Sequence, residues 1–212
     1  MTSASSPARR LLVVATLNAA KGREIRSLLA DLPFDVRPLG DYPGVTLPAE
    51  TEPTYAGNAL LKARAAARLT GALALADDSG IEVDALGGGP GVLSARFAGP
   101  GLDDAGRNAH LLEAIRGVPD DRRTARYRCV VAIVDPGDGG RSPREWTVEG
   151  TCDGRLLCAP RGTGGFGYDP LFFYPPFGRT LAEVTPEEKA RVSHRGIALR
   201  RARDVLSAML YS

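Results

Sequence analysis

Two adjacent carboxylates, Asp77 and Asp78, have the type and spacing of a metal-binding or acid–base pair. They follow a short apolar run and precede Ser79-Gly80. Adjacent carboxylates repel each other unless a cation lies near them, and hard oxygen ligands of this kind suit magnesium. Because neighbouring residues of a strand point to opposite faces, we expect a break at Ser79-Gly80 that brings both side chains to one site. The alternative is an Asx-type turn with two solvated aspartates.

A second candidate site is the loop between an expected strand at residues 11–15 and an expected helix at residues 21–30. A helix N-terminus presents free N–H groups and a positive dipole end, which attract anions. Thr16 and Asn18 are of the residue types that cap helices. Lys21 lies in or near the first turn, where its charge opposes the dipole, so an anionic ligand would explain it. The spacing is not that of a Walker motif, and an ordinary helix start is the alternative.

Four glycines between residues 162 and 167 form a third candidate, because glycine lets a ligand approach the backbone closely. The aromatic side chains of Phe166 and Tyr168 lie in or beside this run. A purine could stack on Phe166, with Asp169 and the loop amides reading its edge. A mobile surface loop is the alternative.

The last candidate contains Lys189, His194 and Arg195. Lys189 could bind phosphate, and the other two could read carbonyls of a base, although such a His-Arg pair is commonly structural. An anion site, a carboxylate pair, a glycine loop with aromatics and a basic cluster together suit a nucleoside triphosphate with magnesium.

The composition singles out a few further residues. The chain has 24 arginines but only three lysines and three asparagines, a pattern that indicates a coding bias against lysine and asparagine. Those that remain are therefore informative, and we assign function to Lys21 first and to Lys62 after it, since lysine is a compact charge that arginine does not replace. The six positions are Lys21, Lys62, Lys189, Asn18, Asn58 and Asn108.

Composition and charge exclude several classes of protein. Of 212 residues, 43% are hydrophobic and 25% are charged, which is ordinary for a globular domain and excludes disorder as the main state. Apolar runs are too short to span a membrane. A net charge of +2 argues against nucleic acid as a partner. Three cysteines without zinc spacing favour a reducing compartment, which we take to be the cytoplasm.

Strand and helix patterns alternate along the chain, which favours one α/β domain with two lobes at residues 9–212 and a flexible tail at residues 1–8. Strands are expected at residues 11–15, near 36, and at 72–76, 81–86, 126–134, 144–150, 154–158 and 171–174. Helices are expected at residues 21–30, 58–69, 103–116, from 186 and at 196–210.

Several motifs together resemble the non-standard purine nucleoside triphosphate pyrophosphatases, the RdgB-type inosine and xanthosine triphosphatases. The resemblance extends from about Leu11 to Leu210. Its motifs are Thr16-Leu-Asn-Ala-Ala-Lys21, Asn58-Ala-Leu-Leu-Lys-Ala-Arg64, Ala76-Asp-Asp-Ser-Gly80, Ala85-Leu-Gly-Gly, Pro90-Gly-Val-Leu-Ser-Ala-Arg96, Gly164-Gly-Phe-Gly-Tyr-Asp-Pro170, Glu188-Lys189 and Ser193-His-Arg-Gly196. It implies hydrolysis of ITP, dITP and XTP to the monophosphate and pyrophosphate, dependence on Mg²⁺ and a homodimer. The implied fold is an elongated mixed β-sheet with flanking helices and two lobes around a central substrate cleft.

The resemblance also implies roles for individual residues. Asp78 would be the proton acceptor and a magnesium ligand, with Asp77 beside it. Ser79 would contact the substrate. The triphosphate would be held by Thr16, Leu17, Asn18, Ala19, Ala20 and Lys21, and the nucleoside pocket would be formed by Phe166, Gly167, Tyr168, Asp169, Lys189, His194 and Arg195.

One position departs from the family pattern. The family has an acidic residue before the asparagine of the second motif, where this chain has Gly57. Three explanations are open: the metal site lacks this ligand and needs more magnesium than its relatives do, the glycine is needed for a positive φ angle, or Glu50 or Glu52 substitutes. Two other functions remain open at this point: a Maf-like pyrophosphatase acting on other nucleotides, and a nucleotide-binding protein with weak catalysis.

Overall fold

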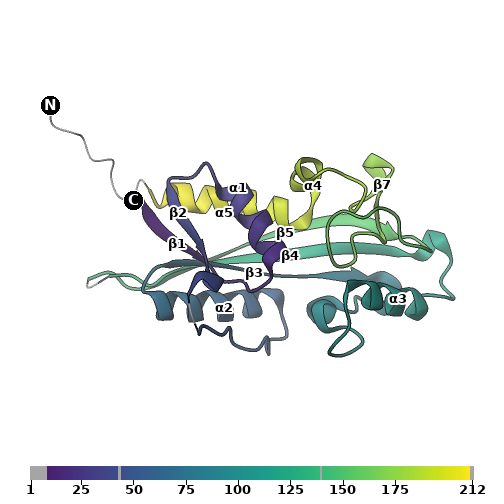
Figure 1. Cartoon of the computed structure of the whole chain (residues 1–212), viewed down its shortest axis with the longest axis horizontal. Coiled ribbons are helices and arrows are strands. Elements are labelled where there is room, and N and C mark those ends of the chain that lie inside the picture. Colours follow the sequence, from purple (N-terminus) through teal and green to yellow (C-terminus); the bar gives the residue numbers. More distant parts are fainter. Residues whose placement is uncertain (1–8, 43, 139, 211–212) are drawn as a thin grey trace.

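The computed structural model describes residues 9–42, 44–138 and 140–210. The tail expected at residues 1–8 lies outside these residues. Figure 1 shows an elongated α/β molecule in which three long strands run from one end to the other. Helices cover both faces of the sheet at one end, and shorter elements gather at the other, which gives the two lobes.

Seven strands form one mixed sheet in the order β2-β1-β3-β4-β5-β6-β7. Strand β1 pairs in parallel with β2 and with β3, and all the other neighbouring strands pair antiparallel. The strands are β1 (Arg10–Val14), β2 (Phe34–Pro38), β3 (Leu73–Val83), β4 (Thr124–Asp135), β5 (Arg144–Leu156), β6 (Phe172–Tyr174) and β7 (Arg179–Thr180).

Helices α1 and α5 cover one face of the sheet, and α2 covers the other (Figure 1). Thr54 caps the start of α2, and Gly71, with φ of 65°, ends it in the left-handed conformation. The side of α2 that meets the sheet is almost entirely alanine, which lets the helix approach closely. The helices are α1 (Ala19–Leu29), α2 (Tyr55–Thr70), α3 (Asp104–Ala114), α4 (Pro186–Val192) and α5 (His194–Ala208), with short 3₁₀ helices between them.

Alternation along β3 divides its side chains between two cores. Leu73 and Leu75 pack towards α1 and α5, whereas Ala74 and Ala76 pack towards α2. A third core fills the far lobe, where Ile81 and Val83 of β3 meet residues of α3 and β6. The same strand thus contributes to every core.

The expected break at Ser79-Gly80 is wrong. Strand β3 continues through it, and β4 pairs with every residue from Ala74 to Val83. This continuous ladder outweighs the turn preference of the local sequence. Strand β1 ends at Val14, opposite Leu75, so β3 loses its neighbour on that side just before the two aspartates.

Most other elements match the sequence predictions, with longer strands than expected. Residues 72–76 and 81–86 belong to one strand up to Val83, and the strand expected at 154–158 is the end of β5. The antiparallel pair of β4 and β5 is confirmed. Among the described residues no helix is both long and apolar enough to cross a membrane.

The first testable prediction concerns Gly150 on β5, over which α5 passes. A Cβ at this position would meet the carbonyl of His194 and lie 2.5 Å from the Ala198 nitrogen. Gly150→Ala should therefore lower the free energy of unfolding by about 1–3 kcal/mol through overpacking. Thermal unfolding should show a Tm several degrees lower. In Gly117→Ala, where the added Cβ meets nothing within 4 Å, Tm should stay near the wild-type value; equal effects in both variants would contradict the prediction.

Candidate active site

The loop after β1 turns into α1 beside the two aspartates. The Asn18 side chain accepts hydrogen bonds from the backbone N–H groups of Ala20 (3.0 Å) and Lys21 (3.1 Å), so the expected N-cap is confirmed. The Lys21 ammonium lies 3.3 Å from a carboxylate oxygen of Asp77, and its side chain is only 18% exposed. In the structure, the anion that balances this lysine at the helix N-terminus is part of the protein itself.

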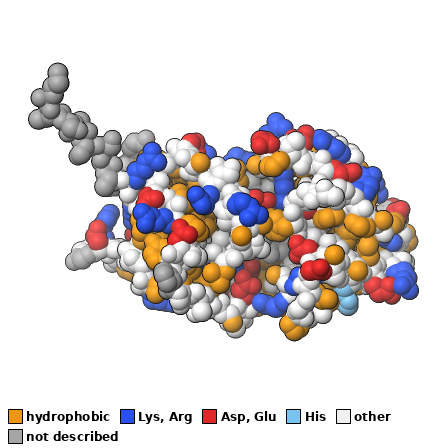
Figure 2. Space-filling model, in the orientation of Figure 1, with side chains coloured by type: hydrophobic (Ala, Val, Ile, Leu, Met, Phe, Trp, Pro, Cys, Tyr) orange, Lys and Arg blue, Asp and Glu red, His pale blue; other side chains and the backbone are white. Residues whose placement is uncertain are grey.

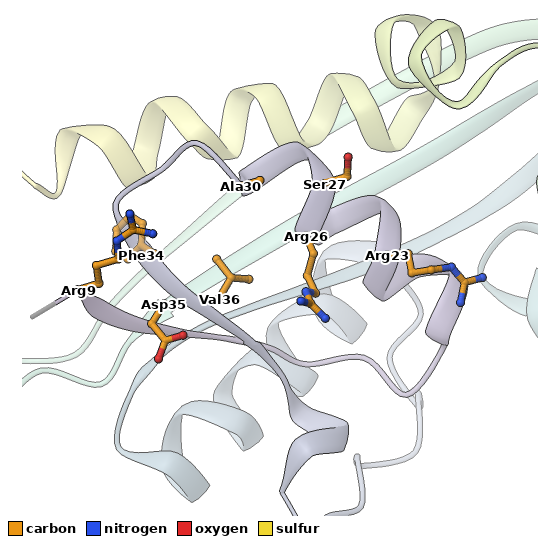
Figure 3. Close-up of a pocket in the computed structure, with 8 residues that line it drawn as sticks. All are labelled: Arg9, Arg23, Arg26, Ser27, Ala30, Phe34, Asp35 and Val36. Atoms are coloured by element: carbon orange, nitrogen blue, oxygen red, sulfur yellow. The ribbon is translucent and has the colours of Figure 1, made fainter.

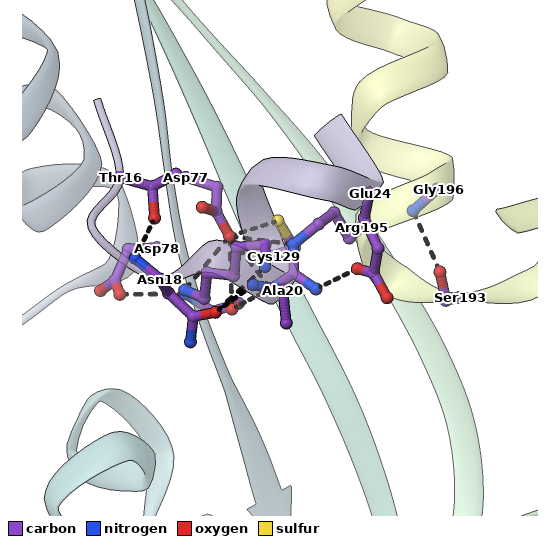
Figure 4. Close-up of polar contacts among 12 residues, drawn as sticks. Thr16, Asn18, Ala20, Glu24, Asp77, Asp78, Cys129, Ser193, Arg195 and Gly196 are labelled. Carbon is purple, nitrogen blue, oxygen red and sulfur yellow. Dashed lines mark hydrogen bonds and ion pairs between the residues drawn. The ribbon is translucent and has the colours of Figure 1, made fainter. Parts of the chain in front are cut away.

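Asp77 is buried on the face of β3 that meets α1 and α5 (Figure 4). Its Oδ2 accepts from Nε and an Nη of Arg195, both at 3.1 Å, whereas its Oδ1 has no hydrogen-bond partner among the described residues. Burial raises the pKa of Asp77, but the charges of Lys21 and Arg195 outweigh burial and bring this pKa well below its usual value. Asp77 is therefore a permanent anion.

Asp78 is buried on the opposite face, towards α2. Asn58 donates to its Oδ2 at 3.1 Å, and the backbone N–H of Ser79 donates to its Oδ1 at 3.0 Å. The Lys62 ammonium lies 3.7 Å from Oδ1 and 2.5 Å from Glu50. Burial, together with the negative charge of Glu50, raises the pKa of Asp78 despite these cationic and hydrogen-bonding partners. A carboxylate with a raised pKa is a better proton acceptor than an ordinary aspartate.

The glycine loop, residues 162–170, meets α4 and α5 at a cavity of about 290 Å³, which is where the nucleoside pocket was predicted. Lys189 contacts Asp169 at 2.6 Å, and its ammonium lies 4.7 Å from the centre of the Phe166 ring. His194 stacks on Tyr127 with ring centres 4.5 Å apart. An aromatic plane and several donors therefore face one small cavity.

The structure brings most of the predicted residues together around this cavity. The following line it: Asn18, Lys21, Ser79, Phe166, Gly167, Tyr168, Asp169, Lys189, His194 and Arg195. Thr16 and Leu17 lie in the loop before α1, Ala19 is the first residue of that helix, and Ala20 lines a neighbouring cavity together with Phe166. Asp77 and Asp78 lie beneath, on opposite faces of β3. Their roles towards substrate or metal remain predictions.

Glu24, which was not predicted from the sequence, joins Lys189 and Arg195 of the basic cluster. Glu24 accepts a hydrogen bond from Lys189 at 2.9 Å. It also accepts one from Arg195 at 2.7 Å, which Figure 4 shows. Asn58 and Lys62, which hold Asp78, also matter more than was predicted from the sequence. The scarcity of lysine and asparagine was the available signal for these two residues, whereas Glu24 has no comparable signal in the sequence.

Gly57 occupies the third position of α2 and has no positive φ, so that explanation of the glycine is wrong. A Cβ here would lie 2.7 Å from the Cβ of Glu52, so a side chain would have to displace Glu52, although the backbone conformation allows one. Glu52 is exposed and holds Asn58 through its backbone N–H and carbonyl. Glu50 is the acid that reaches Lys62 beside Asp78.

A larger groove of about 710 Å³ lies between α1 and β2 (Figure 3). Arg9, Arg23 and Arg26 line it, but none of the predicted site residues does. Figure 2 shows positive and negative side chains mixed over the visible face rather than gathered by sign. Among the described residues there is also no group of three or more histidine, cysteine or acidic side chains that could hold a metal by itself.

Comparisons with known proteins agree with this geometry. The Ham1 family model matches residues 12–205. A dITP/XTP pyrophosphatase of Desulforamulus reducens is 50% identical over 198 residues, which is 93% of this chain and 96% of the relative. A solved HAM1 protein from Coxiella burnetii superimposes with a TM-score of 0.83 at 40% identity, covering 94% of this chain and 99% of that one. The nucleoside-triphosphatase / dITP/XTP pyrophosphatase of Mycobacterium abscessus superimposes with a TM-score of 0.70 at 41% identity, covering 91% and 98% of the two chains.

The second testable prediction concerns the protonation of His194. Burial, together with the charges of Arg195 and Lys189, holds the pKa of His194 well below its ordinary value. The unfolded chain binds this proton near pH 6.5 and the folded chain does not, so the associated stability is present above that pH and is lost as pH falls. Between pH 6.5 and 5.5 the free energy of unfolding should drop by about 1 kcal/mol from this group.

Denaturant titrations at the two pH values measure the effect. In His194→Gln the drop should be smaller by the contribution of this group, whatever the absolute stability of the variant. His110→Gln, at an exposed histidine on α3, is the matched control and should keep the wild-type drop. An unchanged drop in His194→Gln would contradict the assignment.

Proposed function

The chain belongs to the Ham1 family, and we propose that it hydrolyses the non-standard purine nucleotides dITP, ITP and XTP to the nucleoside monophosphate and pyrophosphate. The observation that carries the chemistry is the buried Asp78, held by Asn58 and Lys62 at the open edge of β3. Because the α-phosphorus must be attacked by water, the site needs a proton acceptor there, and Asp78 has a raised pKa.

The triphosphate would lie along the loop of residues 16–21. Lys21 would transfer part of its charge interaction from Asp77 to the phosphates and so stabilise the leaving pyrophosphate. Asp78 would orient the attacking water and take its proton, while the hydrogen bonds from Asn58 and the Ser79 N–H keep the carboxylate in place.

Discrimination between purines would come from the basic cluster. Lysine and arginine side chains are donors only, so Lys189 and Arg195 suit the 6-carbonyl of inosine and xanthine. The 6-amino group of adenine would leave a donor unpaired, and a mismatch of this kind discriminates strongly. Phe166, whose ring lies near both cations, would stack on the base.

Magnesium fits the acidic residues beside this site. Asp78 and Glu50 both contact the Lys62 ammonium, so their hard oxygen atoms lie within reach of one cation, and we propose that they hold Mg²⁺. Asp77, the other predicted ligand, lies on the opposite face of β3, where its buried Oδ1 has no hydrogen-bond partner among the described residues. When bound, Mg²⁺ would neutralise charge on the phosphates of the substrate.

We further propose a homodimer in the cytoplasm, with no nucleic acid or membrane partner. The free thiols of Cys129, Cys152 and Cys158 support a reducing compartment. The buried, cation-paired Asp78 favours catalysis over simple nucleotide binding.

The proposed activity is tested by measuring pyrophosphate release from XTP, dITP, ITP, GTP, ATP and modified pyrimidine nucleotides. Faster turnover of XTP, dITP and ITP than of GTP and ATP supports the proposal. A preference for modified pyrimidines would favour a Maf-like enzyme, and tight binding without turnover would refute catalysis.

The third testable prediction is that Asp78→Asn loses at least about 10²-fold in turnover of XTP, because the variant keeps the shape of the side chain but removes the base. Steady-state kinetics measures this, and circular dichroism checks that the fold is retained. Asp84→Asn, at an exposed aspartate just beyond β3, should keep wild-type turnover. A folded Asp78→Asn variant with near-normal turnover would exclude the assigned role.

The fourth testable prediction separates the two nearby glutamates. Glu50→Gln should raise the magnesium concentration for half-maximal rate by about tenfold or more, since a carboxylate beside the metal is lost. Glu52→Gln should leave the magnesium titration unchanged, because only the backbone of Glu52 contacts the site. Gly57→Glu should lower Tm rather than improve magnesium binding, given the contact with Glu52. Identical titrations for all three variants and the wild type would rule out a metal role for this segment.

A further inference from the structure

The glycine loop carries Phe166 and Asp169, together with two other residues of the nucleoside pocket, on a backbone that has little rigidity of its own. Gly162, Gly165 and Gly167 all have positive φ angles, and glycine has the most conformational freedom to lose on folding. On the side of α4, the loop is fixed through Asp169, which accepts from the Phe166 N–H at 2.9 Å and from Lys189. Other contacts must hold its opposite side.

Helix α3 of the far lobe provides those contacts at Gly167. Asp104 accepts a hydrogen bond from the Gly167 N–H at 2.6 Å. Asn108 donates from its side-chain amide to the Gly167 carbonyl at 2.9 Å and to the Asp104 carbonyl at 2.8 Å. Residues four apart lie on one face of a helix. Asp104 and Asn108 can therefore bind the two peptide groups on either side of Gly167 at the same time.

The same face of α3 forms part of the nucleoside pocket. Asp104 and Arg107 line the cavity together with Phe166 and Asp169. The two hydrogen bonds to Gly167 therefore lie at the proposed base-binding end of the site, between Phe166 and Asp169 in the loop.

Asn108 is also the one scarce asparagine that the proposed function has not used. Asn18 caps α1 ahead of Lys21, and Asn58 donates to Asp78. Asn108 is 7% exposed, lies 59 residues from Gly167 in the sequence, and belongs to none of the motifs that identify the family. Its role requires an amide, since an ionised aspartate could not donate to a carbonyl.

We propose that Asn108 and Asp104 are positioning residues for the purine: by holding both peptide groups of Gly167 they fix the Phe166 ring and Asp169 where the base binds. The inference rests on the proposed function and adds to it a second-lobe element that acts on the base and not on the triphosphate. Loss of the hydrogen bonds from Asp104 and Asn108 to Gly167 should therefore weaken nucleotide binding and leave the recognition of phosphate groups unchanged.

The test compares a substrate with its base-free counterpart. KM for XTP and dITP, and the inhibition constant of inorganic tripolyphosphate, are measured for the full-length wild type, Asn108→Ala, Asp104→Ala and Asp104→Asn. In the two alanine variants KM should rise about 5- to 10-fold, the effect of one lost hydrogen bond. Their inhibition constants for tripolyphosphate should stay within about twofold of wild type, since among the described residues no hydrogen bond or ion pair joins the loop of residues 16–21 to α3. Asp104→Asn keeps an acceptor oxygen and should stay near wild type.

Glu113→Ala, at an exposed residue of the same helix, is the matched control and should change neither constant. Unchanged KM values in both alanine variants, or an equal loss of nucleotide and tripolyphosphate affinity, would overturn the inference. If Asn108→Ala does not fold, Asp104→Ala decides, because that side chain is 54% exposed. Failure of the proposed function would give a different result, namely no pyrophosphate release by the wild type.

Discussion

The burial of two carboxylates in consecutive positions of one strand is the constraint on which the rest of the site depends. An unpaired buried ion is costly, and strand alternation sends Asp77 and Asp78 to opposite faces of the sheet. Each face must therefore supply cations, and it does so from a different helix each time: Lys21 from α1, Arg195 from α5 and Lys62 from α2. The burial of the two carboxylates thus links the charge balance of the site to the placement of α1, α2 and α5 and to the opening where β1 ends. The two aspartates, adjacent in sequence, therefore differ in acidity: the pKa of Asp77 is lowered by Lys21 and Arg195, and burial raises that of Asp78.

Much of this site could be predicted because the chain uses lysine and asparagine so rarely. All three lysines pair with buried aspartates: Lys21 with Asp77, Lys62 with Asp78 and Lys189 with Asp169. The three asparagines, in turn, cap α1, hold Asp78 and hold the glycine loop. A flexible four-carbon ammonium and a short amide do jobs that arginine and aspartate cannot, so a biased composition keeps them where they act. The α/β class and most helices followed from periodicity, which depends on local sequence.

What could not be predicted depends on contacts between distant segments. The sequence Asp-Asp-Ser-Gly favours a turn, and only the ladder with β4 shows that β3 continues through it. Glu24 is an ordinary helix residue until α5 brings Arg195 to it. Gly57 differs from the family pattern, yet the reason for it is the side chain of Glu52 packed against it, which no local rule supplies. The partners of a buried charge come from tertiary structure, whereas the charge itself is visible in the sequence.

The most direct test of this account is the acid limb of the pH profile of kcat/KM for dITP. If Asp78 is the proton acceptor, activity falls as pH drops through its raised pKa, and the neighbouring charges set the midpoint. Lys62 lowers the pKa of Asp78 and Glu50 raises it. The account predicts that the limb moves to higher pH in Lys62→Met and to lower pH in Glu50→Gln. A limb at the wild-type pH in both variants would contradict it.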